Sequence, residues 1–124
     1  MALAMTTLGD RFIDIITQDT DADESPVNDI TGKAGSVYYV KVVNAGSNSS
    51  VYFKLYDSTS ATHATTHPIY VKKVGPSSTV YCVIPDGMAF TNGLSYCVTD
   101  GPGTGSLSDN GPATNDVTVR LVIS

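Results

Sequence analysis

The chain contains no tryptophan, one glutamate (Glu24) and five lysines, and charged residues make up only 15% of its 124 positions. An average domain has about 25% charged residues. Because helices draw on alanine, glutamate, lysine and leucine, this shortage disfavours a helical protein. The positions are taken instead by 15 threonines, 13 serines and 7 tyrosines, together with valine and glycine, which are residue types of strands and turns. The composition therefore predicts an all-β chain.

Positive charge is also scarce. Seven lysines and arginines stand against twelve acidic residues, which gives a net charge of −5, and Lys72-Lys73 is the only basic pair. Nucleic-acid binding depends on cations that neutralise phosphates, and anionic membrane surfaces attract the same residues. No run approaches the roughly 20 apolar residues of a membrane span, and the first residues lack the pattern of a secretion signal. We therefore expect no nucleic acid and no membrane as partner, and a chain made in the cytoplasm.

From residue 27 onward, apolar and polar residues alternate with a period of two between clusters of glycine, proline, asparagine and serine. This is the pattern of strands and turns. The expected strands are 36–44, 51–56, 69–74, 79–84, 88–90, 94–100 and 116–123. Their number and spacing predict a single two-sheet antiparallel β-sandwich, jelly-roll or immunoglobulin-like, of about seven or eight strands. Pro85-Asp86-Gly87 has the residues of a tight turn and is expected to separate two of the strands.

Residues 1–26 differ from the sandwich domain expected over 27–124, and we expect an N-terminal arm with an acidic linker. Its apolar stretch suits either a strand or a short helix, since the two periods cannot be separated over so few residues. Such an arm can dock on the edge of its own domain or on a neighbouring chain. The residues expected to make these contacts are Arg11, Phe12, Ile13, Ile15 and Ile16.

Three aspartates of the acidic run, Asp19, Asp21 and Asp23, have the spacing of the first ligands in an EF-hand calcium loop. The sixth position of that loop requires glycine and holds Glu24, and the twelfth requires glutamate and holds Ile30. We therefore expect a solvated acidic linker here and no metal or cofactor.

The two histidines, His63 and His67, would suit a metal pair on a helix. The threonine-rich sequence between them and Pro68 after them favour a loop with exposed side chains. Nucleophilic catalysis needs a base positioned beside the nucleophile, and the Gly-x-Ser-x-Gly signature is absent from the sequence. We expect a protein that is not an enzyme.

The two cysteines, Cys82 and Cys97, have no close partner in the sequence and fall in predicted strands. Buried free thiols are expected, because free cysteine behaves as a small hydrophobic residue. The alternation places Cys82 with the inward residues of its strand and Cys97 opposite those of its own, which disfavours a disulfide between them.

Tyrosines offer the clearest candidates for an interface. All seven fall on predicted strands, several of them opposite the best core positions. An outward tyrosine buries a large ring at low entropy cost and is enriched at interfaces, although it also occurs on ordinary sheet surfaces. The candidate contacts are Tyr39, Tyr52 and Tyr56, and Tyr81 lies on a strand in the same way.

Three stretches carry a resemblance to known proteins: Val37–Asn44 (VYYVKVVN), Ser49–Asp57 (SSVYFKLYD) and Ile84–Tyr96 (IPDGMAFTNGLSY). They resemble small virion structural proteins of tailed bacteriophages, including phages of cyanobacteria. The resemblance extends over roughly residues 33–124, and the third stretch is its most specific part.

The resemblance implies a capsid decoration (cement) protein: a small β-sandwich on the outer surface of the head that stabilises the shell without catalysis. It further implies the major capsid protein as partner, a homotrimer at threefold positions, and a place in the virion. Two alternatives stay open. One is a receptor- or glycan-binding module of a head fibre or tail, and the other is a head-completion or neck protein.

Overall fold

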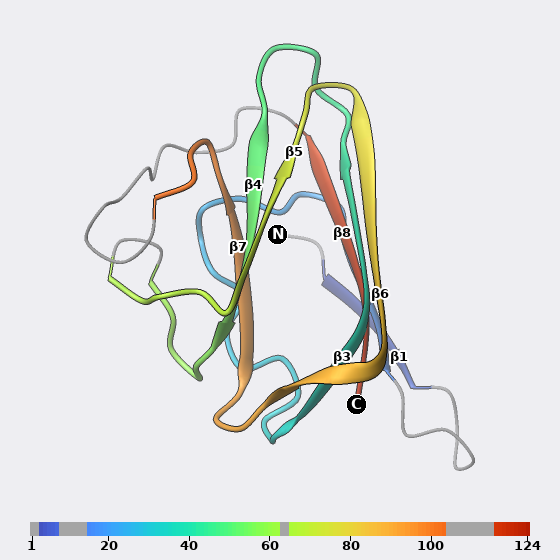
Figure 1. The fold of residues 1–124 in the computed structure, drawn as a ribbon, viewed down its shortest axis with the longest axis vertical. Helices are drawn as coiled ribbons and strands as arrows, with labels where there is room; N and C mark the ends of the chain where they lie inside the picture. The colour runs from blue at the N-terminus through green and yellow to red at the C-terminus, as the bar shows by residue number, and fades with distance from the viewer. Residues whose placement is uncertain (1–2, 8–14, 63–64, 104–115) are drawn as a thin grey trace.

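The computed structural model describes residues 3–7, 15–62, 65–103 and 116–124. These residues form two antiparallel sheets that face each other, one with the strand order β1-β2-β8-β3-β6 and one with the order β5-β4-β7 (Figure 1). The strands are β1 (Leu3–Thr7), β2 (Ile15–Asp19), β3 (Gly35–Asn44), β4 (Val51–Asp57), β5 (Tyr70–Val74), β6 (Ser78–Phe90), β7 (Leu94–Thr99) and β8 (Val117–Ile123). No helix occurs in the described parts of the chain. The all-β sandwich expected from the sequence is confirmed.

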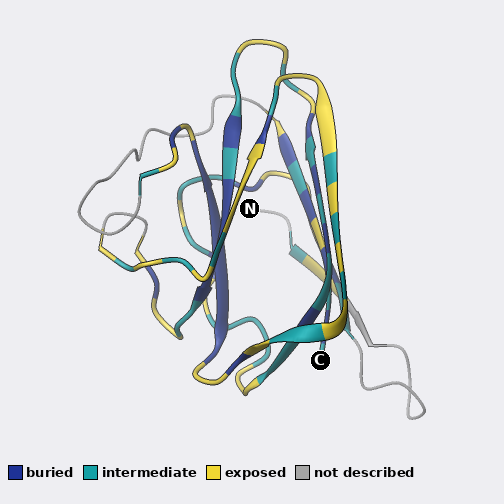
Figure 2. Cartoon of the chain, viewed as in Figure 1, coloured by how far each residue is buried: buried dark blue, intermediate teal, exposed yellow. Residues whose placement is uncertain are grey.

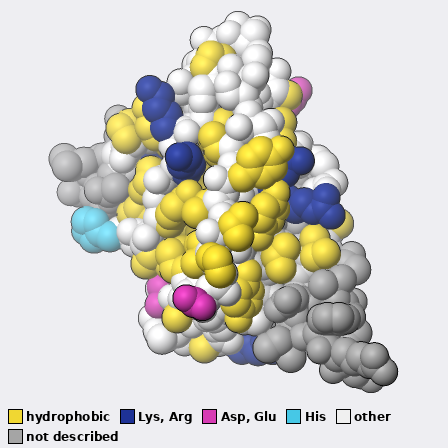
Figure 3. Space-filling model, turned by 45° about the vertical axis from the view of Figure 1, so that its right-hand side comes forward, with side chains coloured by type: hydrophobic (Ala, Val, Ile, Leu, Met, Phe, Trp, Pro, Cys, Tyr) yellow, Lys and Arg dark blue, Asp and Glu magenta, His cyan; other side chains and the backbone are white. Residues whose placement is uncertain are grey.

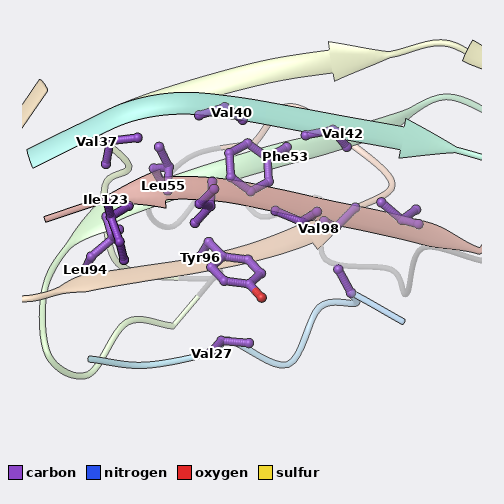
Figure 4. Packing of buried hydrophobic residues seen from close by; sticks show 14 of the residues in the cluster. Val27, Val37, Val40, Val42, Phe53, Leu55, Leu94, Tyr96, Val98 and Ile123 are labelled. Atoms are coloured by element: carbon purple, nitrogen blue, oxygen red, sulfur yellow. The ribbon is translucent and has the colours of Figure 1, made fainter. Parts of the chain in front are cut away.

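Alternation along the strands builds the core. In β8 every second residue is buried, from Val117 to Ile123, while Arg120 between them is exposed. Phe53 of β4 and Tyr96 of β7 meet at the centre, with their ring centroids 5.9 Å apart. Figure 4 shows Phe53 next to the valines of β3, and Tyr96 on the side of Val27. Burial of these apolar side chains is the main force that holds the two sheets together.

The expected turn at Pro85-Asp86-Gly87 does not end a strand, so that prediction is wrong. β6 runs without interruption from Ser78 to Phe90 and bends at these residues. Tyr39 pairs with Val83 but Val37 pairs with Met88, so four residues of β6 lie opposite one residue of β3. Such a bulge bends a strand while its pairing continues on both sides.

Gly87 explains why the bulge falls where it does. Its φ of +80° suits glycine, and a Cβ there would lie 2.8 Å from both Ser36 and Tyr38. The bulge also shifts the alternation of β3, so that Val37, rather than Tyr38, is buried with Val40. The proline and glycine that predicted a turn therefore form a bend within β6 instead.

The described residues before residue 27 contribute strands to the five-stranded sheet, where an arm was expected. β2 pairs with β8, and β1 pairs with β2. Ile15 packs against the core, and Thr17 is buried. Of the two docking positions left open by the sequence, these residues occupy the edge of their own domain. The boundary expected at residue 27 thus falls between β2 and β3.

The acidic run that begins at Asp19, the last residue of β2, was expected to be a solvated linker, and this prediction is wrong for its first residue. Asp19 is fully buried and accepts a hydrogen bond of 2.8 Å from the hydroxyl of Tyr96. Its other oxygen accepts a hydrogen bond of 3.1 Å from the backbone N–H of Asp21. The carboxylate therefore links β2 to β7 across the core.

Residues 23–30 then run along the outer edge of β7. Val27 and Tyr96 exchange two backbone hydrogen bonds of 2.9 and 3.1 Å. The N–H of Val98 donates to the carbonyl of Asp23, and the N–H of Ile30 donates to that of Leu94. This segment satisfies the backbone groups that would otherwise make β7 a free edge.

Candidate functional site: the outer face of the five-stranded sheet

Two rows of side chains cross the outer face of the five-stranded sheet. The register places four residues opposite one another, which we call the apolar row: Ile16, Val122, Tyr39 and Val83. The neighbouring row, which we call the cationic row, is Gln18, Arg120, Lys41 and Tyr81. We call the face that carries both rows the uncovered face.

The most exposed large hydrophobic side chains of the described residues lie on β6, at the end of both rows. Val83 is 67% exposed and Tyr81 is 61% exposed. Val71 of β5 and Ile69 just before β5 are exposed as well but belong to the other sheet, where Val71 stands opposite Lys54. Contiguous exposed apolar surface of this kind marks interaction sites in soluble proteins, because leaving it in water is unfavourable.

Positive charge gathers around these residues. Lys41 and Arg120 stand directly opposite each other on this face, and Lys72 and Lys73 lie on β5, the edge strand of the other sheet. The Nζ of Lys41 lies 5.6 Å from the ring centroid of Tyr81. Figure 3 shows hydrophobic side chains in the middle of this surface and Lys and Arg side chains at its margins.

No carboxylate neutralises these cations within the described part of the chain. None of the four forms an ion pair there. Like charges directly opposite each other on a sheet are destabilising, so the pair of Lys41 and Arg120 costs stability in the isolated chain. An acidic partner surface would remove that repulsion.

Tyr70 of β5 and Cys82 of β6 pack against the core from the two sheets on this side. Burial, together with the neighbouring thiol of Cys82, raises the pKa of Tyr70 to about 12. Cys82 is half-buried, and both cysteines are free, as the sequence predicted.

The outer face of the three-stranded sheet differs, because loops cover it along β4 and β7. We call this region the covered face. Tyr56 is fully buried there with Ala61 and Cys97. The hydroxyl of Tyr56 lies 3.3 Å from the sulfur of Cys97, and burial raises the pKa of both groups.

The covering loops are held by hydrogen bonds to these strands and to the segment 23–30. Lys54, also fully buried, donates from Nζ to the carbonyl of Gly103 at 2.5 Å. The hydroxyl of Ser95 donates to the carbonyl of Ser58, and the N–H of Ala61 donates to the side chain of Asn28. These contacts remove the outward side chains of β4 and β7 from solvent.

The residues predicted as interface contacts are therefore divided between different places. Ile16 and Tyr39 lie in the apolar row, whereas Ile15 packs against the core. Tyr52 is half-buried on the three-stranded sheet. Tyr56 is fully buried, so its ring is not available to a partner, which corrects that prediction. The predicted contacts Arg11, Phe12 and Ile13 lie outside the described residues.

Sequence reasoning missed Val83 as an exposed residue and gave Tyr81 no special weight. The alternation of β6 placed both on the outward side, because Val80, Cys82 and Ile84 share the inward side. That signal was present in the sequence. The position of β6 at the end of its sheet was not, and this position leaves both side chains exposed.

The other motifs do not converge on a site. Asp19 is engaged with Tyr96, His67 is exposed, and His63 lies outside the described residues. Over the described ranges, no three His, Cys, Asp or Glu side chains are placed to hold a metal ion. No helix in those ranges is long and apolar enough to span a bilayer.

Comparison of the chain with protein-family models, with curated proteins and with solved structures finds no match.

Proposed function

We propose that this chain is a capsid decoration protein of a tailed bacteriophage, which binds the outer surface of the head and stabilises the shell without catalysis. The observation that carries the proposal is the uncovered face. Val83 and Tyr81 are its most exposed hydrophobic residues, and unpaired cations stand beside them. Such a surface favours docking on another protein. The resemblance of the strand sequences to small virion proteins supports the identity of that partner.

In this proposal the partner is the major capsid protein, the location is the surface of the virion, and the chain acts as a homotrimer at threefold positions. Three copies engaged together bind more tightly than one, because the second and third contacts become intramolecular. Each contact can then be modest. Lys41 and Arg120 on the uncovered face are opposite in sign to the net charge of −5 of the chain.

Co-sedimentation with phage heads tests the proposal. Heads of the phage whose genome carries this chain, freed of the protein, are mixed with the purified chain and pelleted. We expect saturable binding and greater resistance of the heads to heat. A double variant, Tyr81→Ser with Val83→Ser, is expected to bind at least about tenfold more weakly, since the exposed apolar contacts are lost.

Met5→Ser is the matched control, because Met5 is an exposed hydrophobic residue on β1 at the other end of the same sheet. Its binding should stay within twofold of the wild type. Absence of the chain from the pellet at all concentrations contradicts the proposal. Light scattering tests the trimer separately, with an expected mass of about 39 kDa, three times 13.0 kDa.

A further inference from the structure

The unpaired edge of β6 distinguishes it from the edge strands of the other sheet. β6 pairs with β3 on one side, and no described residue pairs with its other side. The edge of β7 is covered by residues 23–30 through backbone hydrogen bonds. Figure 2 shows β7 buried along its length, whereas much of β6 is exposed or half-buried. Among the described residues, one long edge of the sandwich therefore keeps free backbone donors and acceptors.

Charges protect β5 but not β6. Lys72 lies opposite the inward residue Phe53, so this edge strand has a charged side chain on the side that faces the core. Lys73, the next residue of β5, adds a second charge to the same edge. Inward charges and lysines on an edge strand prevent uncontrolled pairing with other chains. The stretch 78–84 of β6 contains no charged residue. This exposed stretch therefore lacks the charged side chains that would prevent it from pairing with another chain.

The length of this free edge is limited by Pro85. Proline has no N–H to donate, and the bulge at residues 84–87 bends the strand away from its straight path. The straight part, residues 78–84, spans about 23 Å at the usual rise of about 3.3 Å per residue. It can pair with one extended segment of about six or seven residues.

The chemistry of that segment follows from what surrounds the edge. On the outer side it would lie beside Tyr81 and Val83, which favour apolar side chains. On the inner side, toward the neighbouring strand β5, it would meet Lys72, whose position opposite Phe53 faces the core side of that edge, and this cation favours a carboxylate. Asp86, beyond Pro85, is the one acidic residue of β6. The charges of the edge thus complement a segment that is both acidic and apolar.

We infer that the free edge of β6 is a binding site for an extended, acidic and apolar segment of a partner protein, which pairs with it as an additional antiparallel or parallel strand. Main-chain hydrogen bonds supply affinity in this mode, and alternate side chains supply specificity. The inference goes beyond the proposed function, because it names a site and the chemistry of its ligand and does not require the partner to belong to a phage head.

The test uses the intact chain and synthetic peptides, with no phage component. The probe is an eight-residue peptide that alternates valine and glutamate, and the matched peptide alternates valine and lysine. Binding is followed by fluorescence anisotropy. We expect the glutamate peptide to bind at least tenfold more tightly than the lysine peptide, and to weaken as salt screens the charges.

A third peptide separates strand pairing from simple charge attraction. It keeps the valine and glutamate side chains but carries N-methyl groups on alternate backbone amides, which removes the donors for pairing. At least tenfold weaker binding is expected. Equal binding of the methylated and unmethylated peptides would overturn the inference, because it would show that the edge does not pair.

Charge reversal on the protein locates the site. The double variant Lys72→Glu with Lys73→Glu should bind the glutamate peptide at least tenfold more weakly, whereas Lys33→Glu in an exposed loop should stay within twofold. A similar loss in Lys33→Glu contradicts the assignment to β6. Sedimentation equilibrium completes the test: a dimer that the peptide dissociates would mean that a second copy occupies the edge, which also overturns the inference.

Discussion

The outer faces of the two sheets are built from the same kind of strand but end in opposite states. On the three-stranded sheet, Tyr56 is fully buried under loop residues and touches Cys97. On the five-stranded sheet, Tyr81 is 61% exposed and Val83 is 67% exposed. Alternation places all of these side chains outward from their sheets. Whether an outward side chain belongs to a second small core or to the surface is decided by the loops that cross it.

We therefore expect changes on the two faces to affect different properties, namely folding stability and binding. The covered face holds a fully buried lysine, a buried thiol and a buried tyrosine, all of which are in contact with the loops after β4 and β7. Changes there should alter the free energy of unfolding. The uncovered face holds exposed apolar residues and an unpaired pair of cations, so changes there should alter binding and leave folding almost unchanged.

The largest expected effect is the loss of Tyr56. Tyr56→Ala removes a fully buried ring and leaves a cavity beside Cys97, which should lower the free energy of unfolding by about 3 kcal/mol or more. Tyr81→Ala is the matched variant on the uncovered face and should change it by less than about 0.5 kcal/mol. Urea unfolding curves measure both. Equal losses in the two variants would remove the distinction between the faces.

Thiol reactivity should differ between the two cysteines. Cys97 is buried and burial raises the pKa of its thiol, whereas Cys82 is half-buried near the free edge of β6. A thiol reagent at pH 8 should therefore label Cys82 at least about tenfold faster, because Cys97 must wait for the covering loops to open. Cys82→Ser and Cys97→Ser assign the two rates. Faster labelling of Cys97 would show that the loops do not exclude solvent.

The connection between the two sheets should depend on pH. The N–H groups of Asn92 and Thr91, between β6 and β7, donate to the carboxylate of Asp57 and hold its pKa below its usual range. A carboxyl group whose pKa is lower in the folded state stabilises the fold above the unfolded pKa, near 4, and this contribution is lost as the pH falls through the folded pKa.

Asp57→Asn should therefore cost stability at neutral pH, and the difference from the wild type should shrink below about pH 4. Urea unfolding at pH 7, 5, 4 and 3 measures this difference. A constant difference across the series would mean that the charge of Asp57 does not stabilise the connection.

The smallest expected effect concerns the two cations of the uncovered face. Arg120→Gln removes the repulsion between Arg120 and Lys41, so the free energy of unfolding should rise by about 0.2–0.5 kcal/mol at low salt. The gain should disappear at high salt, where charges are screened. Destabilisation by this variant would show that Arg120 supports the fold of the isolated chain.

The strands of the sandwich were largely predictable from the sequence, because alternation with turn residues is a local signal. The predicted strand 36–44 is observed as Gly35–Asn44, and the predicted strand 51–56 as Val51–Asp57. The strand pairing of β2 was not predictable, since its short apolar stretch fitted two periods. The bulge at Gly87 was missed because the same residues form a turn or a bend, and the pairing across β3 decides between them.

The candidate site could be predicted only in part. Tyr39 was placed correctly on an outward face, and Tyr56 was placed on the right side of its strand. The burial of Tyr56 depends on Ala61 and on loop residues far along the chain, and the exposure of Val83 depends on the position of β6 at the end of its sheet. Both depend on contacts between residues far apart in the sequence, which the local alternation of apolar and polar residues does not reveal.

Hydrogen exchange with and without bound phage heads tests the central claim most directly. The claim is that the uncovered face and the edge of β6 form the docking surface. It predicts that binding slows exchange in residues 78–84 and leaves residues 51–57 and 94–99 unchanged. Slower exchange confined to the loops over β4 and β7, with residues 78–84 unaffected, would contradict it.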